Sequence, residues 1–70
     1  MKSDRLSEIT PELQAARDDE VLAEGSIREA LGAGQWSAAH RAVDQLHEAR
    51  EKRAALEAEL EELLIAALTA

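Results

Sequence analysis

The 70-residue sequence has no cysteine, and it holds only one aromatic residue, one proline and three glycines. Without cysteine, neither a disulfide nor a zinc–thiolate site can hold a small fold together. No apolar run approaches the roughly 18 residues that a membrane span needs, and no charged-then-apolar signal peptide opens the chain. We therefore expect a cytoplasmic protein without a membrane span.

Basic residues are also scarce: eight stand against fifteen acidic ones, which gives a net charge of -7. Surfaces that bind nucleic acid or anionic membranes need clustered lysine and arginine. This charge balance therefore argues against a nucleic-acid partner. The abundant residues are alanine, glutamate, leucine and arginine, a composition typical of long helices and coiled coils.

Apolar and small residues recur at alternating spacings of three and four, which is the period of one helical face. We call the two resulting series the seam. The first series is Leu6, Ile9, Leu13, Ala16, Glu20, Ala23, Ile27 and Ala30, and the second is Ala39, Ala42, Leu46, Ala49, Arg53, Leu56, Leu60, Leu63 and Ala67. The seam predicts an all-α protein with two amphipathic helices.

A glycine-rich stretch, Gly32-Ala33-Gly34, separates the two series. Glycine just past a helix end commonly provides a left-handed cap, and the hydroxyl of Ser37 is suited to cap the next helix. We expect helices over 11–33 and 37–68, joined by a turn at 34–36.

The start of the first helix is marked by Thr10-Pro11-Glu12, with a capping hydroxyl, a proline in the first turn and a carboxylate near the positive end of the helix dipole. Residues 11–70 then form the helical hairpin, and residues 1–10 form a separate N-terminal segment. One helical turn kinked at Pro11 is an option for that segment. The expected helix over 11–33 could also be broken at Gly25. The seam stays in phase across Gly25, however, which favours a continuous helix.

The two series fit each other when the chain folds back at residues 34 and 35, because facing positions then have numbers that sum to 69. Leu13 meets Leu56, for example. This register predicts an antiparallel, coiled-coil-like two-helix hairpin. Glu20 and Arg53 interrupt the seam, each faces an alanine, and they lie one turn apart across it. We expect them to form a structural ion pair that disfavours shifted registers.

Residues 30–46 resemble the turn of a tetratricopeptide-type helix pair. In that family a glycine ends one helix, an aromatic residue opens the next, and small residues allow a close crossing. The matching residues here are Gly32, Trp36 and Ala39. No second copy follows, and the second helix is longer than such a repeat, so the resemblance implies only a close crossing at the turn.

Many apolar residues fall outside the seam, and a hairpin of this size buries little core by itself. We therefore expect a homo-oligomer, a dimer in the simplest case, in which two hairpins form a four-helix bundle. Its shape would be similar to that of the small repressor-of-primer hairpin dimers. We also expect docking onto a larger protein. The predicted interface residues are Val21, Leu22, Leu31, Trp36, Val43, Leu64, Ile65 and Leu68.

No constellation of residues indicates catalysis or a cofactor, so we expect a non-enzymatic interaction and assembly module. An acidic inhibitor or regulatory subunit of a nucleic-acid-binding protein is an alternative. A metal-binding bundle is a second alternative, because the spacing of His40, Asp44 and His47 places three potential ligands on one helix face. Ligands of a metal site in a helical bundle point inward, whereas His40 and His47 lie beside the seam and Asp44 lies opposite it, which counts against that site.

Overall fold

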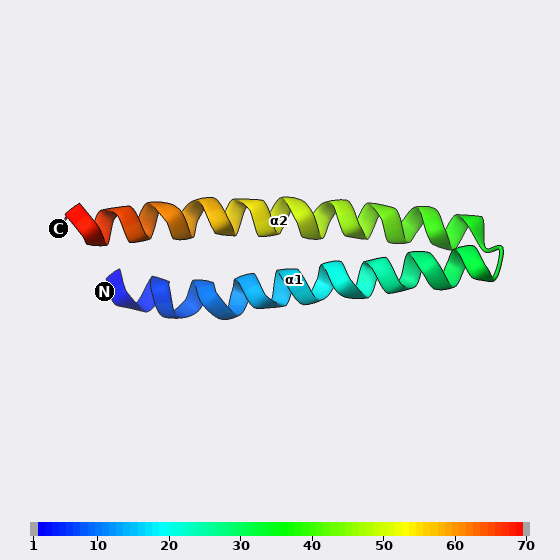
Figure 1. The fold of residues 1–70 in the computed structure, drawn as a ribbon, viewed down its shortest axis with the longest axis horizontal. Coiled ribbons are helices and arrows are strands. Elements are labelled where there is room, and N and C mark those ends of the chain that lie inside the picture. Colours follow the sequence, from blue (N-terminus) through cyan, green and yellow to red (C-terminus); the bar gives the residue numbers. More distant parts are fainter. Residues whose placement is uncertain (1, 70) are drawn as a thin grey trace.

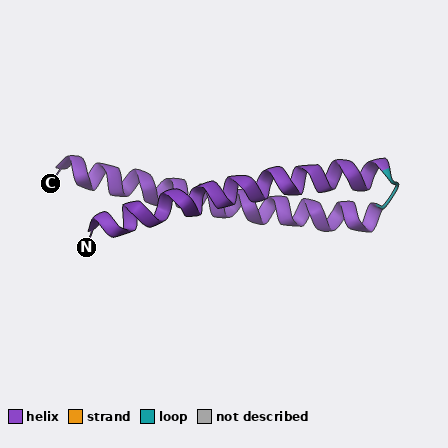
Figure 2. Ribbon diagram, turned by 90° about the horizontal axis from the view of Figure 1, so that it is seen from below, coloured by secondary structure: helices purple, strands orange, loops and turns teal. Residues whose placement is uncertain are grey.

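The computed structural model describes residues 2–69, with side chains from Arg5 to Thr69. Helix α1 spans Lys2–Gly32 and helix α2 spans Trp36–Thr69. The two helices run antiparallel as a hairpin about 54 Å long and 15 Å wide (Figure 1). Seen from the side, they cross each other at a shallow angle (Figure 2). Residues 2–69 contain no strand, so the all-α hairpin predicted from the seam is confirmed.

The turn is held by a Schellman cap at the end of α1. Gly34 has a φ of 71°, the left-handed conformation that glycine adopts without strain. The N–H of Gln35 donates to the carbonyl of Ala30 at 2.8 Å, and the N–H of Gly34 donates to that of Leu31 at 3.2 Å. These two bonds satisfy carbonyls that the helix end would leave unpaired.

Helix α2 begins at Trp36, one residue before the expected position. The carbonyl of Gln35 accepts the N–H of Ala39 at 3.0 Å, so Gln35 occupies the N-cap position. Ser37 lies inside the first turn of the helix and does not have the capping position that we expected. The turn is correspondingly residues 33–35 and not 34–36.

The start of α1 differs more. The helix begins at Lys2 and runs through Pro11, so the described part of the expected N-terminal segment belongs to α1. Thr10 is not a cap: its hydroxyl donates to the carbonyl of Leu6 at 3.3 Å, one turn back in the same helix. The helix also continues through Gly25, so α1 is unbroken from Lys2 to Gly32.

The seam forms the contact between the helices. Among residues 5–69, every buried hydrophobic residue belongs to the predicted series: Ile9, Leu13, Ala16, Ala23, Ala30, Ala39, Ala42, Leu46, Ala49 and Leu56. Of the seam positions only Ala67 is exposed, because it lies beyond the end of the core cluster. Six of these ten buried residues are alanines, and the larger ones gather away from the turn. In the view of Figure 1 the two helices lie farther apart at the end opposite the turn than near the turn.

The core cluster proper lies toward the open end, by which we mean the end of the hairpin opposite the turn. It consists of Ile9, Leu13, Ala16 and Leu56, with Leu60 and Leu63 packed against it. In the part of the chain that the structure describes, neither helix contains an apolar stretch long enough to cross a membrane.

Candidate interaction surface

Glu20 and Arg53 meet across the seam. The Nε of Arg53 donates to Oε2 of Glu20 at 2.6 Å, and its Nη1 donates to Oε1 of Glu57 at 2.6 Å. The two carboxylates, Glu20 foremost, hold the pKa of Arg53 above its ordinary value. Arg50 lies 3.7 Å from the other oxygen of Glu20, whose side chain is only 13% exposed. The expected ion pair is therefore present, and it links the two helices of the hairpin.

One flank of the hairpin is marked by Arg5 and Glu59. Arg5 donates through Nε and Nη2 to the two carboxylate oxygens of Glu59, the second bond at 2.6 Å, and through Nη1 to Glu12 at 2.7 Å. These contacts hold the pKa of Glu59 below its ordinary value and that of Arg5 above it. Because seven residues make almost two helical turns, residues seven positions from Arg5 or Glu59 lie on the same face of their helix.

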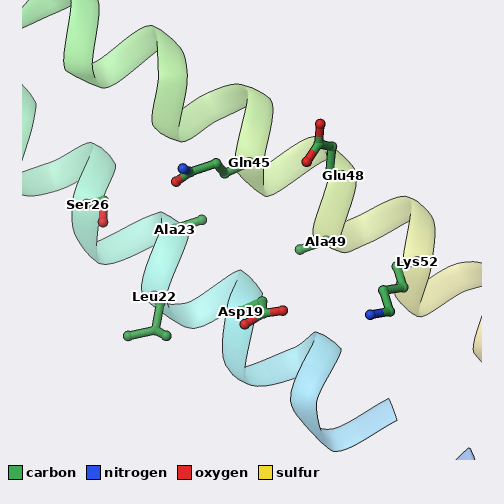
Figure 3. Close-up of a pocket in the computed structure, with 8 residues that line it drawn as sticks. All are labelled: Asp19, Leu22, Ala23, Ser26, Gln45, Glu48, Ala49 and Lys52. Atoms are coloured by element: carbon green, nitrogen blue, oxygen red, sulfur yellow. The ribbon is translucent and has the colours of Figure 1, made fainter. Parts of the chain in front are cut away.

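We call this side the polar flank. Toward the turn it continues as an open groove between the helices, with Asp19 and Ser26 on α1 and Gln45 and Lys52 on α2 (Figure 3). Leu22 is drawn on the rim of this groove with its side chain pointing away from α2. A surface so rich in hydrogen-bonding groups is well solvated by itself and does not require a partner.

The opposite flank is marked by Arg17 and Glu57, which lie 4.0 Å apart across the helices. Seven-residue steps from this pair define four rungs, each with one position on α1 and one on α2. From the open end the rungs are Thr10 with Leu64, Arg17 with Glu57, Glu24 with Arg50, and Leu31 with Val43; Trp36 is the next position on α2. We call this side the mixed flank, because charged rungs lie between apolar ends.

At the open end the mixed flank contains an apolar groove. Its lining is Leu13, Arg17, Glu57, Leu60, Glu61, Leu64, Ile65 and Leu68. Leu64 and Ile65 are about half exposed, and Leu68 is 86% exposed. Large apolar side chains gathered at one end in this way are typical of a surface that another chain covers. We call this feature the open-end groove.

At the turn end the mixed flank carries a second apolar group, which we call the turn patch. It consists of Leu31, Val43 and Trp36, of which Val43 is half-buried and Trp36 is 65% exposed. Tryptophan contributes a large contact area at low entropic cost and is enriched at interfaces. The mixed flank therefore has two apolar ends suited to contact another chain.

The structure separates the predicted interface residues into groups. Six of them lie at the two ends of the mixed flank or beside it: Leu31, Trp36, Val43, Leu64, Ile65 and Leu68. Val21 and Leu22 are well exposed on α1, on the side away from the seam. The Arg5–Glu59–Glu12 network was not predicted from the sequence, because residues 1–10 were expected to form a separate segment. The seven-residue spacing of Arg5 and Glu12 was the signal that points to it.

His40, Asp44 and His47 are all exposed on the outer side of α2. Among residues 5–69 no three histidine, aspartate or glutamate side chains are grouped so that they could hold a metal ion. The metal-binding alternative therefore has no support in the geometry.

No protein-family model matches this chain, and neither does any curated protein or solved structure. The interpretation of the surface consequently depends on its own chemistry and area.

Proposed function

We propose that the protein is a non-catalytic, cytoplasmic assembly module, in which two hairpins associate through their mixed flanks into a four-helix bundle. The observation that supports this proposal is the pair of exposed apolar groups on one flank, the open-end groove and the turn patch. Burying an exposed leucine or isoleucine side chain is worth about 1.5–3 kcal/mol. A second chain that covers both groups would supply stability that the alanine-rich seam lacks.

The accessible surface supports the same proposal. It amounts to 5260 Å² for this 7.6 kDa chain, whereas a compact monomer of that mass exposes about 4,300 Å². A standard protein interface covers about 800 Å² on each partner. The surplus of the elongated hairpin is thus close to the area that a single interface removes.

Leu22 is left for a different contact. It lies away from the seam on α1, and neither the open-end groove nor the turn patch includes it. In a dimer formed through the mixed flank it remains on the outside, whereas Val21, four residues after Arg17 and three before Glu24, lies beside the charged rungs. We therefore propose that the assembled bundle also docks onto a larger protein, through a separate site that includes Leu22.

Size-exclusion chromatography with light scattering tests the self-association. The wild type should elute as a dimer at micromolar concentration, and Leu64→Glu should shift it toward monomer because a carboxylate then lies in the open-end groove. Leu22→Glu is the matched control: the same substitution at another well-exposed leucine should leave the dimer intact.

A wild-type monomer at about 100 µM would contradict self-association, since a surface that removes several half-exposed leucines from water should have at least micromolar affinity. A dimer that responds to Leu22→Glu and not to Leu64→Glu would place the interface on the polar flank. Either result would overturn the proposal as stated.

A further inference from the structure

The side-chain charge is distributed unevenly along the hairpin. The open third, residues 5–12 with 57–69, holds one arginine and six glutamates, a net charge of -5. The turn third, residues 25–45, holds two arginines, one glutamate and one aspartate, a net charge of zero. The acidity of the protein is therefore concentrated at the end that also holds the open-end groove.

Two hairpins can bring their mixed flanks together in two symmetric ways. With the twofold axis along the hairpin, the turns lie at the same end, and two open thirds of charge -5 lie side by side. With the axis across the hairpin, each open third lies on the neutral turn third of the other chain. Like-charge contacts at an interface disfavour an arrangement, and repulsion between neighbouring ends is only partly screened at physiological salt.

We propose that the partner of the mixed flank is a second copy of this chain in end-for-end orientation, with the turn patch of each copy covering the open-end groove of the other. This inference depends on the self-association proposed above and adds its geometry. In this orientation the interface has two equivalent apolar contacts, each between a turn patch and an open-end groove. The same-direction dimer would instead have one contact between the two turn patches and one between the two grooves.

The order of the rungs fits this arrangement. A twofold axis that passes across the hairpin between the Arg17–Glu57 and Glu24–Arg50 rungs superposes these two rungs. Arg17 then faces Glu24 of the second copy, and Glu57 faces Arg50 of the second copy, so each charge meets its opposite. The central charges of the mixed flank are thereby compensated, as they also are in the same-direction dimer, where Arg17 faces Glu57 of the second copy. The rungs therefore permit the end-for-end dimer, and the charge of the open thirds decides between the two.

The same axis fixes the apolar contacts at both ends. It carries the rung of Thr10 and Leu64 onto the rung of Leu31 and Val43, so Leu64 faces Val43 of the second copy. Trp36 then reaches beyond Leu64 of the second copy, toward the highly exposed Leu68. The most exposed side chains at the two ends cover one another.

The absence of cysteine makes site-directed spin labelling straightforward, because a single introduced cysteine is the only reactive thiol. Ser37→Cys places a label on the exposed start of α2 without altering the turn patch. In the end-for-end dimer the two labels are separated along the bundle by 33 residues of rise, about 50 Å. In the same-direction dimer they lie across the bundle from each other, about 20 Å apart. Pulsed dipolar spectroscopy resolves these two distances.

Glu51→Cys is the control label, because it lies near the middle of α2 and should report a short distance in either orientation. A short Ser37 distance together with a short Glu51 distance would overturn the end-for-end orientation and leave self-association standing. Absence of dipolar coupling from both labels, with a monomeric mass, would overturn both proposals.

A complementation experiment tests the specific contact between Val43 and Leu64. In the end-for-end dimer, Val43→Glu alone and Leu64→Arg alone each damage both copies of this contact. In a mixture, one contact becomes Glu with Arg and the other stays Val with Leu, so mixing should restore dimers by light scattering. In the same-direction dimer these residues never face each other. If both single variants are helical but their mixture remains monomeric by light scattering, the inference is wrong.

Discussion

Glu20 and Arg53 are charged residues within the seam, and the structure explains how the seam tolerates them. The Glu20 carboxylate is 13% exposed and accepts from Arg53 at 2.6 Å, while Arg50 lies farther away, at 3.7 Å. Arg53 is more exposed and has Glu57 as a second partner at 2.6 Å. The two members of the pair therefore depend on each other unequally, because removal of Arg53 leaves the more buried charge with its weaker partner.

Arg53→Ala should accordingly lower the free energy of unfolding, because it leaves the largely shielded Glu20 carboxylate with its weaker partner. Glu20→Ala should cost less, because Arg53 keeps its bond to Glu57. The double variant should be more stable than Arg53→Ala alone. Urea unfolding followed by circular dichroism at fixed protein concentration measures all three. Arg41→Ala, on an exposed arginine in none of these ion pairs, is the control, and strictly additive effects would contradict the coupling.

The network of Arg5 and Glu59 predicts a pH dependence. Arg5 holds the pKa of Glu59 below the ordinary value of about 4.5, so the ionised form is favoured in the folded state. The resulting stability is fully present above the ordinary pKa and is lost as the pH falls through the lowered one. Glu59→Gln should therefore be less stable than the wild type at neutral pH, and this difference should shrink below about pH 4.5.

Urea unfolding across a series of pH values measures the Glu59 effect. Glu51→Gln removes the same charge from an exposed position in none of the ion pairs of residues 5–69, and it is the control. A stability difference for Glu59→Gln that stays constant from neutral to acid pH would show that the network does not depend on ionisation of Glu59.

At the scale of the helices, periodicity was sufficient to predict the fold. Two series with a 3,4 spacing identified the buried residues from Ile9 to Leu56, because a helix in contact with one partner buries one face only. The boundaries were harder. Pro11 is compatible with the first turn of a helix and also with its interior when neighbouring turns adjust, so local signals could not decide where α1 begins.

The sequence predicted which apolar residues lie on the surface of the hairpin, but not how they are grouped on it. The apolar residues outside the seam were identified by their phase, but their grouping into two ends of one flank depends on which side of α1 lies against which side of α2. Only the cross-helix pairs, Arg17 with Glu57 and Arg5 with Glu59, identify the flanks. A sequence without those contacts in view gives no reason to separate Leu64 from Leu22.

Two glycines, Gly25 in α1 and Gly34 in the turn, allow a matched test of the helix and the turn. Gly25 lies inside α1, and a Cβ added there would meet nothing within 4 Å. Gly25→Ala should thus raise the free energy of unfolding by about 0.5–1 kcal/mol through helix propensity. Gly34 has equally open surroundings but a φ of 71°, so Gly34→Ala should lower it by about 1–2 kcal/mol.

Thermal unfolding of both glycine variants at one protein concentration provides the comparison. Because the same methyl group is added at two open positions, opposite signs isolate the backbone conformation as the cause. Destabilisation by Gly25→Ala would instead indicate that α1 is broken or strongly bent at that residue, the option that the sequence left open.

At the scale of the whole molecule, an elongated hairpin with an alanine-rich seam should have stability that depends on association. A ligand or partner that binds only the folded state raises the melting temperature by mass action, and a second copy of the chain acts as such a partner. The melting temperature of the wild type should therefore rise with its own concentration. Leu64→Glu together with Leu68→Glu should abolish this dependence and lower both helicity and melting temperature, since the exposed apolar end then has no cover.

Circular dichroism melts between about 5 and 200 µM measure this dependence directly. Leu22→Glu adds the same kind of charge to a well-exposed apolar position outside the mixed flank, and it should keep the concentration dependence of the wild type. A wild-type melting temperature that does not change with concentration, together with a monomeric mass, would mean that the seam stabilises the hairpin without assistance. The open-end groove and the turn patch would then be surfaces for a different protein.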